Sequence, residues 1–145
     1  MAARYRLGLG RRAANRIIRA LLRLGLGPAG TYLLTVAGQR SGAPRSTPVT
    51  LVEDGGRRWL VSPYGEVAWV RNLRAAGRAT LSRGGRTETI AVSEIGVDDA
   101  ALVLKTYVTR VPITRPYFDA RPGSDLAQFR AEAPRHPVFV ITSRP

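Results

Sequence analysis

The sequence predicts a mainly β domain with flanking helices, an α+β fold in which six strands are enough to close a small antiparallel barrel. β-Branched and aromatic residues gather in six short runs. Glycine pairs separate two of the neighbouring pairs of runs, as is typical of hairpins. Four other segments carry the apolar spacing or the capping signals of helices.

The first predicted element is an amphipathic helix over residues 10–24, which ends before Gly25 and Pro28. Its apolar side carries Ala14, Ile17, Ile18, Leu21 and Leu22. Its basic side carries Arg12, Arg16, Arg19 and Arg23. Two interpretations stay open. The helix packs on its own domain with a solvated basic face, or it lies on an anionic membrane surface with its apolar side in the headgroup region.

Six strands are predicted over residues 32–37, 45–53, 58–61, 78–83, 86–95 and 137–142. Asp54-Gly55-Gly56 and Gly84-Gly85 supply the positive φ angles of tight turns, and residues 38–44 form a longer loop. Neighbouring strands are therefore expected to be antiparallel.

Three shorter helices are expected between and after the strands. Residues 67–76 place Trp69, Val70 and Leu73 on one stripe and stop at Gly77. Asp98 and Asp99 are predicted to cap a helix that runs to about residue 109. Residues 111–123 contain three prolines and are expected to cross irregularly, and Ser124 is predicted to start a last helix that ends near residue 132.

Length and composition exclude several functional classes. The 145 residues fit one folded domain at 28–145, preceded by the basic segment at 1–27. The chain has no cysteine and one histidine, which excludes zinc fingers, iron–sulfur clusters, thiol nucleophiles and a Ser-His-Asp triad, unless His136 alone serves as a base. No metal site is expected, because Asp98 and Asp99 are better explained as a helix cap.

The formal net charge of +13 predicts an anionic partner. Residues 1–52 hold nine arginines and no acidic residue. Nucleic acid is not expected, because aromatic residues are not interleaved with the basic run between residues 4 and 23. No apolar run of about 18 residues and no signal core occur, so the expected location is cytoplasmic, with possible attachment of residues 10–24 to the inner membrane face.

Two loops carry the candidate chemistry. Residues 38–45 combine glycines, a serine and two arginines, a composition that either binds a phosphate or forms a solvated basic hairpin. Residues 62–66, Ser-Pro-Tyr-Gly-Glu, precede a helix that begins near Trp69. A planar ring fits against the exposed backbone of such a turn, although Trp69 alone is also explained as the core anchor of its helix.

Together the two loops resemble the deazaflavin-dependent nitroreductase family. The resemblance rests on Gly38-x-Arg40-Ser41-Gly42-x-Pro44-Arg45-x-Thr47-Pro48, on a following strand pair that ends at Ser62, and on Trp69-x-x-Asn72-Leu73-Arg74-Ala75. It is clearest between residues 32 and 81. It implies a split β-barrel of the FMN-binding type, an oxidoreductase that takes hydride from the reduced deazaflavin coenzyme F-420, and a homodimer.

The resemblance also implies a coenzyme site. Its phosphate and carboxylate end would use Arg40, Ser41, Arg45, Thr47 and Pro48. Its ring end would use Ser62, Tyr64, Gly65, Trp69 and Asn72. Arg71 and Arg74 either add positive charge there or face water.

The expected reaction reduces an electrophilic small molecule such as an enone, a quinone or a nitro compound. A proton must follow the hydride, and Tyr117, Tyr64, Ser62 or water can supply it. Tyr117 is equally explained as an apolar contact beside Pro116 and Phe118. The second loop and the later aromatic residues depart from the nitroimidazole reducers of the family, so that activity is not predicted.

Two alternatives to this function remain. The same barrel can bind FMN, as related split barrels do. A protein of a different class, a non-catalytic binder of lipid or of an anionic membrane surface, would use the N-terminal helix and an apolar cleft of the barrel.

Overall fold

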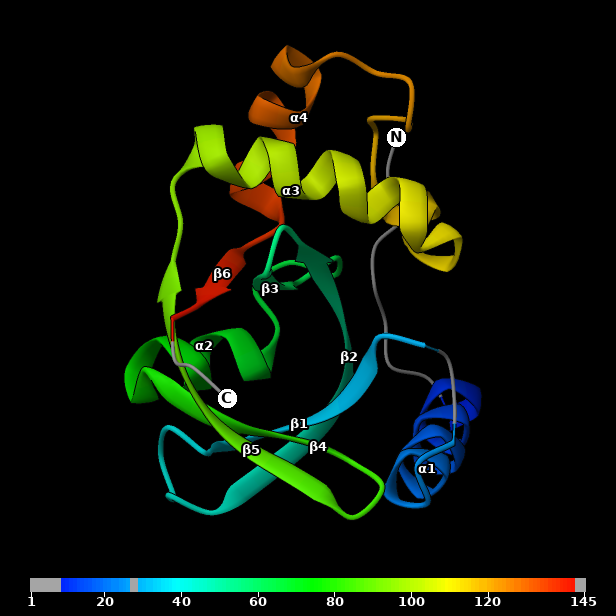
Figure 1. Ribbon diagram of the computed structural model, residues 1–145, viewed down its shortest axis with the longest axis vertical. Helices are drawn as coiled ribbons and strands as arrows, with labels where there is room; N and C mark the ends of the chain where they lie inside the picture. The colour runs from blue at the N-terminus through cyan, green and yellow to red at the C-terminus, as the bar shows by residue number, and fades with distance from the viewer. Residues whose placement is uncertain (1–8, 27–28, 143–145) are drawn as a thin grey trace.

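The computed structural model describes residues 9–26 and 29–142, and it contains a closed six-stranded barrel flanked by helices (Figure 1). The strands are β1 Thr31–Ala37, β2 Pro44–Asp54, β3 Arg57–Val61, β4 Arg78–Arg83, β5 Arg86–Glu94 and β6 Val138–Ile141. The helices are α1 Leu9–Arg23, α2 Ala68–Ala76, α3 Val97–Arg110 and α4 Leu126–Glu132, with 3-10 turns η1 Pro112–Tyr117 and η2 Ala133–Arg135. The predicted fold class is confirmed.

The barrel has the strand order β1-β2-β3-β6-β5-β4, and every described pair of neighbours is antiparallel. The glycine turns form as predicted. Gly55, Gly56 and Gly84 have φ angles of +58°, +78° and +62°, which residues with a β-carbon rarely adopt. Each hairpin therefore depends on its glycines.

Two apolar cores hold the molecule together. One fills the barrel, where Leu34, Leu60 and Ile90 are completely buried. The other lies between the outer face of β2, β3 and β6 and the helices α3 and α4, with Leu104 and Phe129 at its centre. Figure 1 shows α3 and α4 together on one side of the barrel. Each fully buried side chain of this size contributes roughly 1.5–3 kcal/mol by leaving water.

The predicted helix caps are wrong at two positions. Gly96, not Asp98 or Asp99, is the N-cap of α3, and both aspartates lie in the first turn, where their charge favours the positive end of the helix. Asp125, not Ser124, caps α4 by accepting a hydrogen bond of 3.0 Å from the Gln128 N–H. The predicted irregular crossing also contains one regular piece, η1.

Helix α1 turns only part of its predicted apolar side toward the barrel. Leu22 is completely buried, and its carbonyl accepts a 2.6 Å hydrogen bond from the Gly84 N–H. Ile17 and Leu21, on the same predicted side, remain 62% and 36% exposed. Arg19, predicted on the basic side, is half-buried, and its Nε has no partner among the described residues. The barrel thus contacts one edge of a wider apolar side.

Some predictions for the N-terminal segment lie outside the described residues. They concern residues 1–8 and 27–28 and the side chains of Arg12 and Ala14. The described helices include none that has the length and the apolar character needed to span a bilayer.

Antiparallel pairing decides where the two candidate loops lie. β1 ends, β2 begins and β3 ends at the same end of the barrel, so residues 38–43 and 62–67 meet there. Helix α2 closes this end by burying Val70 and Leu73 against the interior core. We call it the α2 end. The turns at Gly55 and Gly84 lie at the opposite end.

Candidate functional site

The first loop of the α2 end, residues 38–43, is tightly closed on itself. The Gly38 N–H donates to the Ala43 carbonyl at 2.7 Å, and the Gly42 N–H donates to the Gly38 carbonyl at 2.8 Å. The Ala43 N–H donates to Ser41 Oγ at 3.2 Å. These backbone donors are therefore occupied within the loop. The guanidinium groups of the loop region are then its strongest groups for binding an anion.

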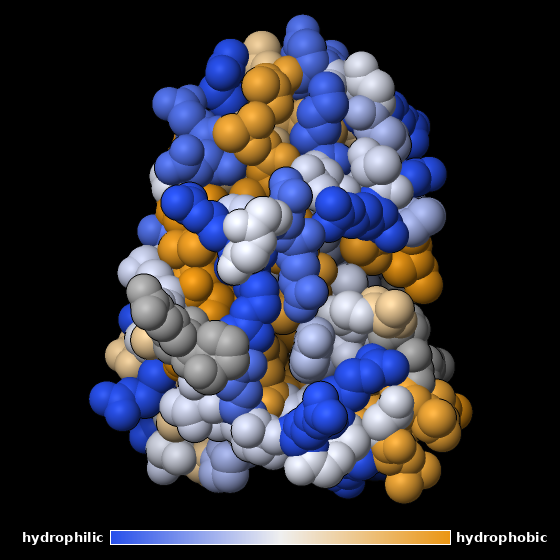
Figure 2. Space-filling model, viewed as in Figure 1, coloured by the Kyte–Doolittle hydropathy of each residue, from blue (hydrophilic) through white to orange (hydrophobic). Residues whose placement is uncertain are grey.

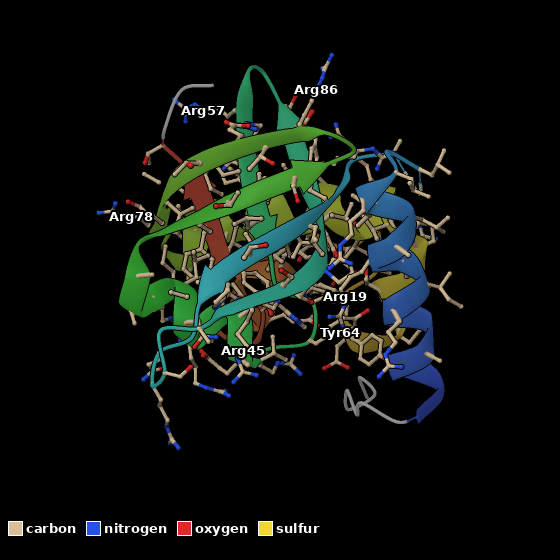
Figure 3. All side chains as sticks on the ribbon, turned by 90° about the horizontal axis from the view of Figure 1, so that it is seen from below. Arg19, Arg45, Arg57, Tyr64, Arg78 and Arg86 are labelled. Atoms are coloured by element: carbon tan, nitrogen blue, oxygen red, sulfur yellow. The ribbon has the colours of Figure 1, made fainter. Side chains whose placement is uncertain are left out.

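Two arginines of this loop region have side chains without a partner among the described residues. Arg40 and Arg45 are exposed, and their guanidinium groups form no hydrogen bond or ion pair with the residues that the structure describes. Figure 3 shows Arg45 and Tyr64 on one side of the barrel and Arg57 and Arg86 on the other. The α2 end thus carries cations that are available to a ligand.

The β1–β2 register places the other predicted phosphate-end residues. Thr47 lies opposite Leu34, on the side of β2 that faces the barrel interior, and Arg45 shares this side. Pro48 lies opposite Leu33, on the outer side. The structure therefore groups Thr47 with Arg45 and separates Pro48 from both.

Asn72 joins the two loops of the α2 end. Its Oδ1 accepts a 2.9 Å hydrogen bond from the Gln39 N–H, which ties helix α2 to the first loop. Asn72 and Gln39 are 33 positions apart in the sequence. The amide therefore fixes the distance between the arginine-bearing loop and the helix that follows the second loop.

The second loop, residues 62–67, is a tight turn closed by Ser62. The serine is completely buried, and its hydroxyl donates to the Gly65 carbonyl at 2.6 Å. Gly65 has a φ of +87°, and a β-carbon there would lie 3.4 Å from the Arg135 carbonyl oxygen. The Val67 N–H donates to the same Gly65 carbonyl at 2.9 Å. The hydroxyl hydrogen of Ser62 is thus committed to the turn.

Tyrosines from separate segments meet beside this turn. The rings of Tyr64 and Tyr117 make an edge contact with centroids 4.8 Å apart and planes at 82°. Burial raises the pKa of Tyr107, and electrostatic interaction with Tyr64 raises it further, while a hydrogen bond with Thr114 opposes both. The sequence does not indicate Tyr107 as a neighbour of the site, because 43 positions separate it from Tyr64.

Trp69 packs inward. It is partly buried against the barrel-interior core, with its ring centroid 6.2 Å from that of Phe139. This contact fits the interpretation of Trp69 as the core anchor of α2.

Two predicted cations of α2 are engaged by protein groups. Arg74 forms ion pairs with Glu66 and Glu94, and the hydrogen bond from Arg74 lowers the pKa of Glu66. The guanidinium of Arg71 donates to the Glu66 carbonyl. Both side chains are exposed. Their contacts brace the turn against the helix, and the charge of Arg74 is balanced by two carboxylates.

A buried Glu132–His136 pair lies behind the turn. The two side chains are 2% and 4% exposed, and His136 Nε2 lies 3.0 Å from Glu132 Oε1. Burial lowers the pKa of His136, while the hydrogen bond with Glu132 opposes this shift. His136 was expected at most as a lone base, and Glu132 was not expected beside it. The sequence signal that could have indicated this pair is the four-residue spacing between a carboxylate and the single histidine.

The comparisons with known proteins bear directly on this site. A model of the F-420H(2)-dependent quinone reductase family matches residues 12–121. The chain belongs to this family. The match spans both loops of the α2 end, and it makes the protein an F-420-dependent reductase, as the resemblance implied. No match was found among curated proteins.

Solved structures confirm the split-barrel fold of this reductase. An F-420-H2 dependent reductase has a TM-score of 0.56 and 22% identity, with 79% of this chain and 95% of that chain covered. A protein described as a domain-swapped dimer has a TM-score of 0.57 and 20% identity, with 92% and 96% covered. A NimC/NimA family protein from Clostridium acetobutylicum has a TM-score of 0.53 and 17% identity, with 86% and 80% covered.

The residues of the α2 end fit coenzyme F-420. The coenzyme has a planar ring at one end and a phosphodiester with a polyglutamate tail at the other. Two guanidinium groups that have no partner in the part of the chain that the structure describes suit the anionic end. A rigid glycine turn beside Tyr64 suits the ring.

Proposed function

We propose that the reductase binds coenzyme F-420 across the α2 end and reduces a quinone-like electrophile beside Tyr64 and Tyr117. Arg40 and Arg45 hold the phosphate or the tail carboxylates, with Ser41 and Thr47 as neutral donors. The turn at residues 62–67 holds the ring. The observation that carries this proposal is that two arginines without side-chain partners among the described residues lie at the same end of the barrel as a buried-serine turn.

The protein's own groups divide the remaining work. When bound in reduced form, the coenzyme supplies hydride. Ser62 keeps its hydroxyl hydrogen on Gly65 and shapes the turn. A phenol hydroxyl can donate a hydrogen bond, so Tyr117 or Tyr64 stabilises the negative charge that develops on the substrate and delivers the proton. Arg71 and Arg74 brace the turn rather than bind the coenzyme.

The test of this function is turnover. Purified full-length protein is mixed with the reduced coenzyme and with a substituted quinone, an enone or a nitroarene in separate assays. We expect protein-dependent oxidation of the coenzyme, fastest with the quinone. Absence of oxidation with all three acceptors, or saturable binding of FMN in place of F-420, would refute the proposal.

We also propose that residues 1–27 form a segment distinct from the barrel at 28–145 and attach the reductase to an anionic membrane surface. Ile17, Leu21, Leu24 and Leu26 are 36–73% exposed. Figure 2 shows apolar atoms gathered at the edge of the molecule where Figure 1 places α1. Arg16 and Arg23 are exposed on the same helix, as an interfacial helix requires.

A homodimer is the proposed assembly. It rests on the similarity to the domain-swapped dimer and on the family resemblance. Sedimentation at micromolar concentration tests it. We expect twice the mass of one chain, and monomer alone would contradict the proposal.

A further inference from the structure

We propose that Glu132 and His136 are positioning residues. They hold together the two segments that carry the tyrosines of the site, one with Tyr64 and the other with Tyr117, which we call its two walls. This inference rests on the proposed function, because it assumes that the turn at residues 62–67 and the Tyr64–Tyr117 pair contact coenzyme and substrate. It assigns a role to a buried polar pair that the proposed chemistry does not use.

Glu132 binds the backbone of the segment that follows Tyr117. Its Oε1 accepts the Asp119 N–H at 2.7 Å, and its Oε2 accepts the Ala120 N–H at 2.8 Å. A buried carboxylate is costly unless donors surround it, and these two backbone groups are fixed donors. Helix α4 therefore clamps the chain two and three residues beyond Tyr117.

His136 binds the backbone of the wall that carries Tyr64. Its Nδ1 lies 2.9 Å from the carbonyl oxygen of Pro63, which is the residue directly before Tyr64. Its ring stacks on Phe118, the residue after Tyr117, with centroids 4.0 Å apart and planes at 21°. One imidazole thus contacts the residue before Tyr64 and the residue after Tyr117, the two tyrosines whose rings are in edge contact.

The two hydrogen bonds of His136 require hydrogens at particular atoms. A carbonyl oxygen only accepts, so the Pro63 contact requires a hydrogen on Nδ1. The Nε2–Oε1 contact requires one further proton, which either the ring or the carboxyl can hold. Arg135 is the neighbouring charge, 3.9 Å from Glu132 Oε1, and it also pairs with Asp119 at 3.1 Å. The positions of both walls therefore depend on the hydrogen-bonded Glu132–His136 pair.

The chain offers a variant for each of the two hydrogen bonds. The side-chain amide of His136→Asn keeps a donor near the Nδ1 position, but it is too short to bond to Glu132. His136→Gln keeps a donor near the Nε2 position and loses the bond to Pro63. We expect His136→Gln to weaken coenzyme binding roughly threefold to tenfold, the effect of one hydrogen bond, and His136→Asn to weaken it less. Arg130→Gln, on the exposed face of α4, is the matched control and should leave affinity unchanged.

Thermal unfolding of the same variants separates positioning from mere stability. Both histidine variants lose a buried contact and should unfold at lower temperatures than wild type. A purely structural role would make coenzyme affinity follow the unfolding temperature in both. Equal affinity in the two histidine variants, at whatever level, would overturn the proposal.

Wild-type protein provides a second measurement that needs no variant. His136 is the single histidine of the chain, so labelled imidazole gives one NMR signal. We expect this signal to shift when F-420 is added and not when inorganic phosphate alone is added. Coenzyme binding without a shift would overturn this inference and leave the proposed function standing. Absence of coenzyme binding to wild type would overturn the proposed function itself, and this inference with it.

Discussion

At the scale of single residues, Arg45 offers the clearest test of the anionic end. Replacing Arg45 by Ala should weaken coenzyme binding by about 1.5–3 kcal/mol, the usual range for a hydrogen bond to a charged group. Fluorescence titration measures this loss. Arg40→Ala should behave alike.

Arg86 supplies a control that removes the same charge. It is exposed and lies on the side of the barrel away from Arg45 in Figure 3. Arg86→Ala should leave coenzyme affinity nearly unchanged. If it costs as much as Arg45→Ala, the coenzyme responds to net charge and the first loop is not its anion site.

Tyr117 tests the proton step. Tyr117→Phe should reduce kcat by about 10²-fold, the lower range for general acid catalysis, and leave coenzyme affinity unchanged. Tyr64→Phe is made in parallel, because either phenol can donate. Tyr107→Phe is the control, since this buried phenol interacts with Thr114 and its removal should affect stability rather than kcat. Full kcat in both Tyr64→Phe and Tyr117→Phe would show that water delivers the proton.

Residue identities in the two loops suggest part of the proposed site, but they do not suggest the buried contacts of His136 behind it. Arg40 and Arg45 stand out because glycines and arginines cluster in residues 38–45. Ser62 and Tyr64 stand out because they belong to a short glycine-containing segment before a helix. The partner of His136 is a backbone carbonyl 73 positions away. No local spacing rule reports such a contact, since it depends on how α4 and β3 pack.

At the scale of elements, the buried histidine between η2 and β6 makes stability depend on pH. Burial lowers the pKa of His136 below its usual value of 6.5. The unfolded chain therefore binds this proton more readily than the folded chain, so the stability that the neutral ring contributes is complete above pH 6.5 and is lost as pH falls through the lowered pKa. The free energy of unfolding should decrease between pH 7.5 and pH 5.5.

Urea unfolding of wild type and His136→Gln at these two pH values checks this prediction. The variant should lose less stability on acidification than wild type. Glu66 and Glu88, whose pKa values are lowered by Arg74 and Arg58, lose their contributions only below their usual value of 4.5. A steeper pH dependence in the variant would contradict the assignment.

The strands and turns were predictable because their signals are local. β-Branched runs and glycine turns specify hairpins without reference to the rest of the chain. The orientation of α1 was not predictable in the same way. Its apolar side is wider than the surface that the barrel offers, so Leu22 is buried while Ile17 stays exposed. Tertiary packing alone decides which edge is covered.

At the scale of the whole molecule, the exposed side of α1 tests membrane attachment. Serine at both Ile17 and Leu24 should abolish sedimentation with anionic vesicles and preserve coenzyme affinity. Wild-type sedimentation should also weaken as salt rises, because each basic side chain near such a surface contributes about 1 kcal/mol. Leu102→Ser is the matched control, since Leu102 is 56% exposed on α3. Equal loss in the control, or full binding by the α1 variant, would refute attachment through α1.

The central claim concerns which end of the barrel binds the coenzyme, and two glycines test it most directly. Gly65 lies in the turn of the α2 end and Gly55 in a turn of the opposite end, with φ angles of +87° and +58°. Alanine strains the backbone at either position, but only at Gly65 would it disturb the proposed ring site. The measurement is a titration of wild type, Gly65→Ala and Gly55→Ala with coenzyme F-420. We predict saturable binding to wild type and Gly55→Ala and strongly weakened binding to Gly65→Ala. Equal binding by all three proteins, or selective loss in Gly55→Ala, would contradict the account.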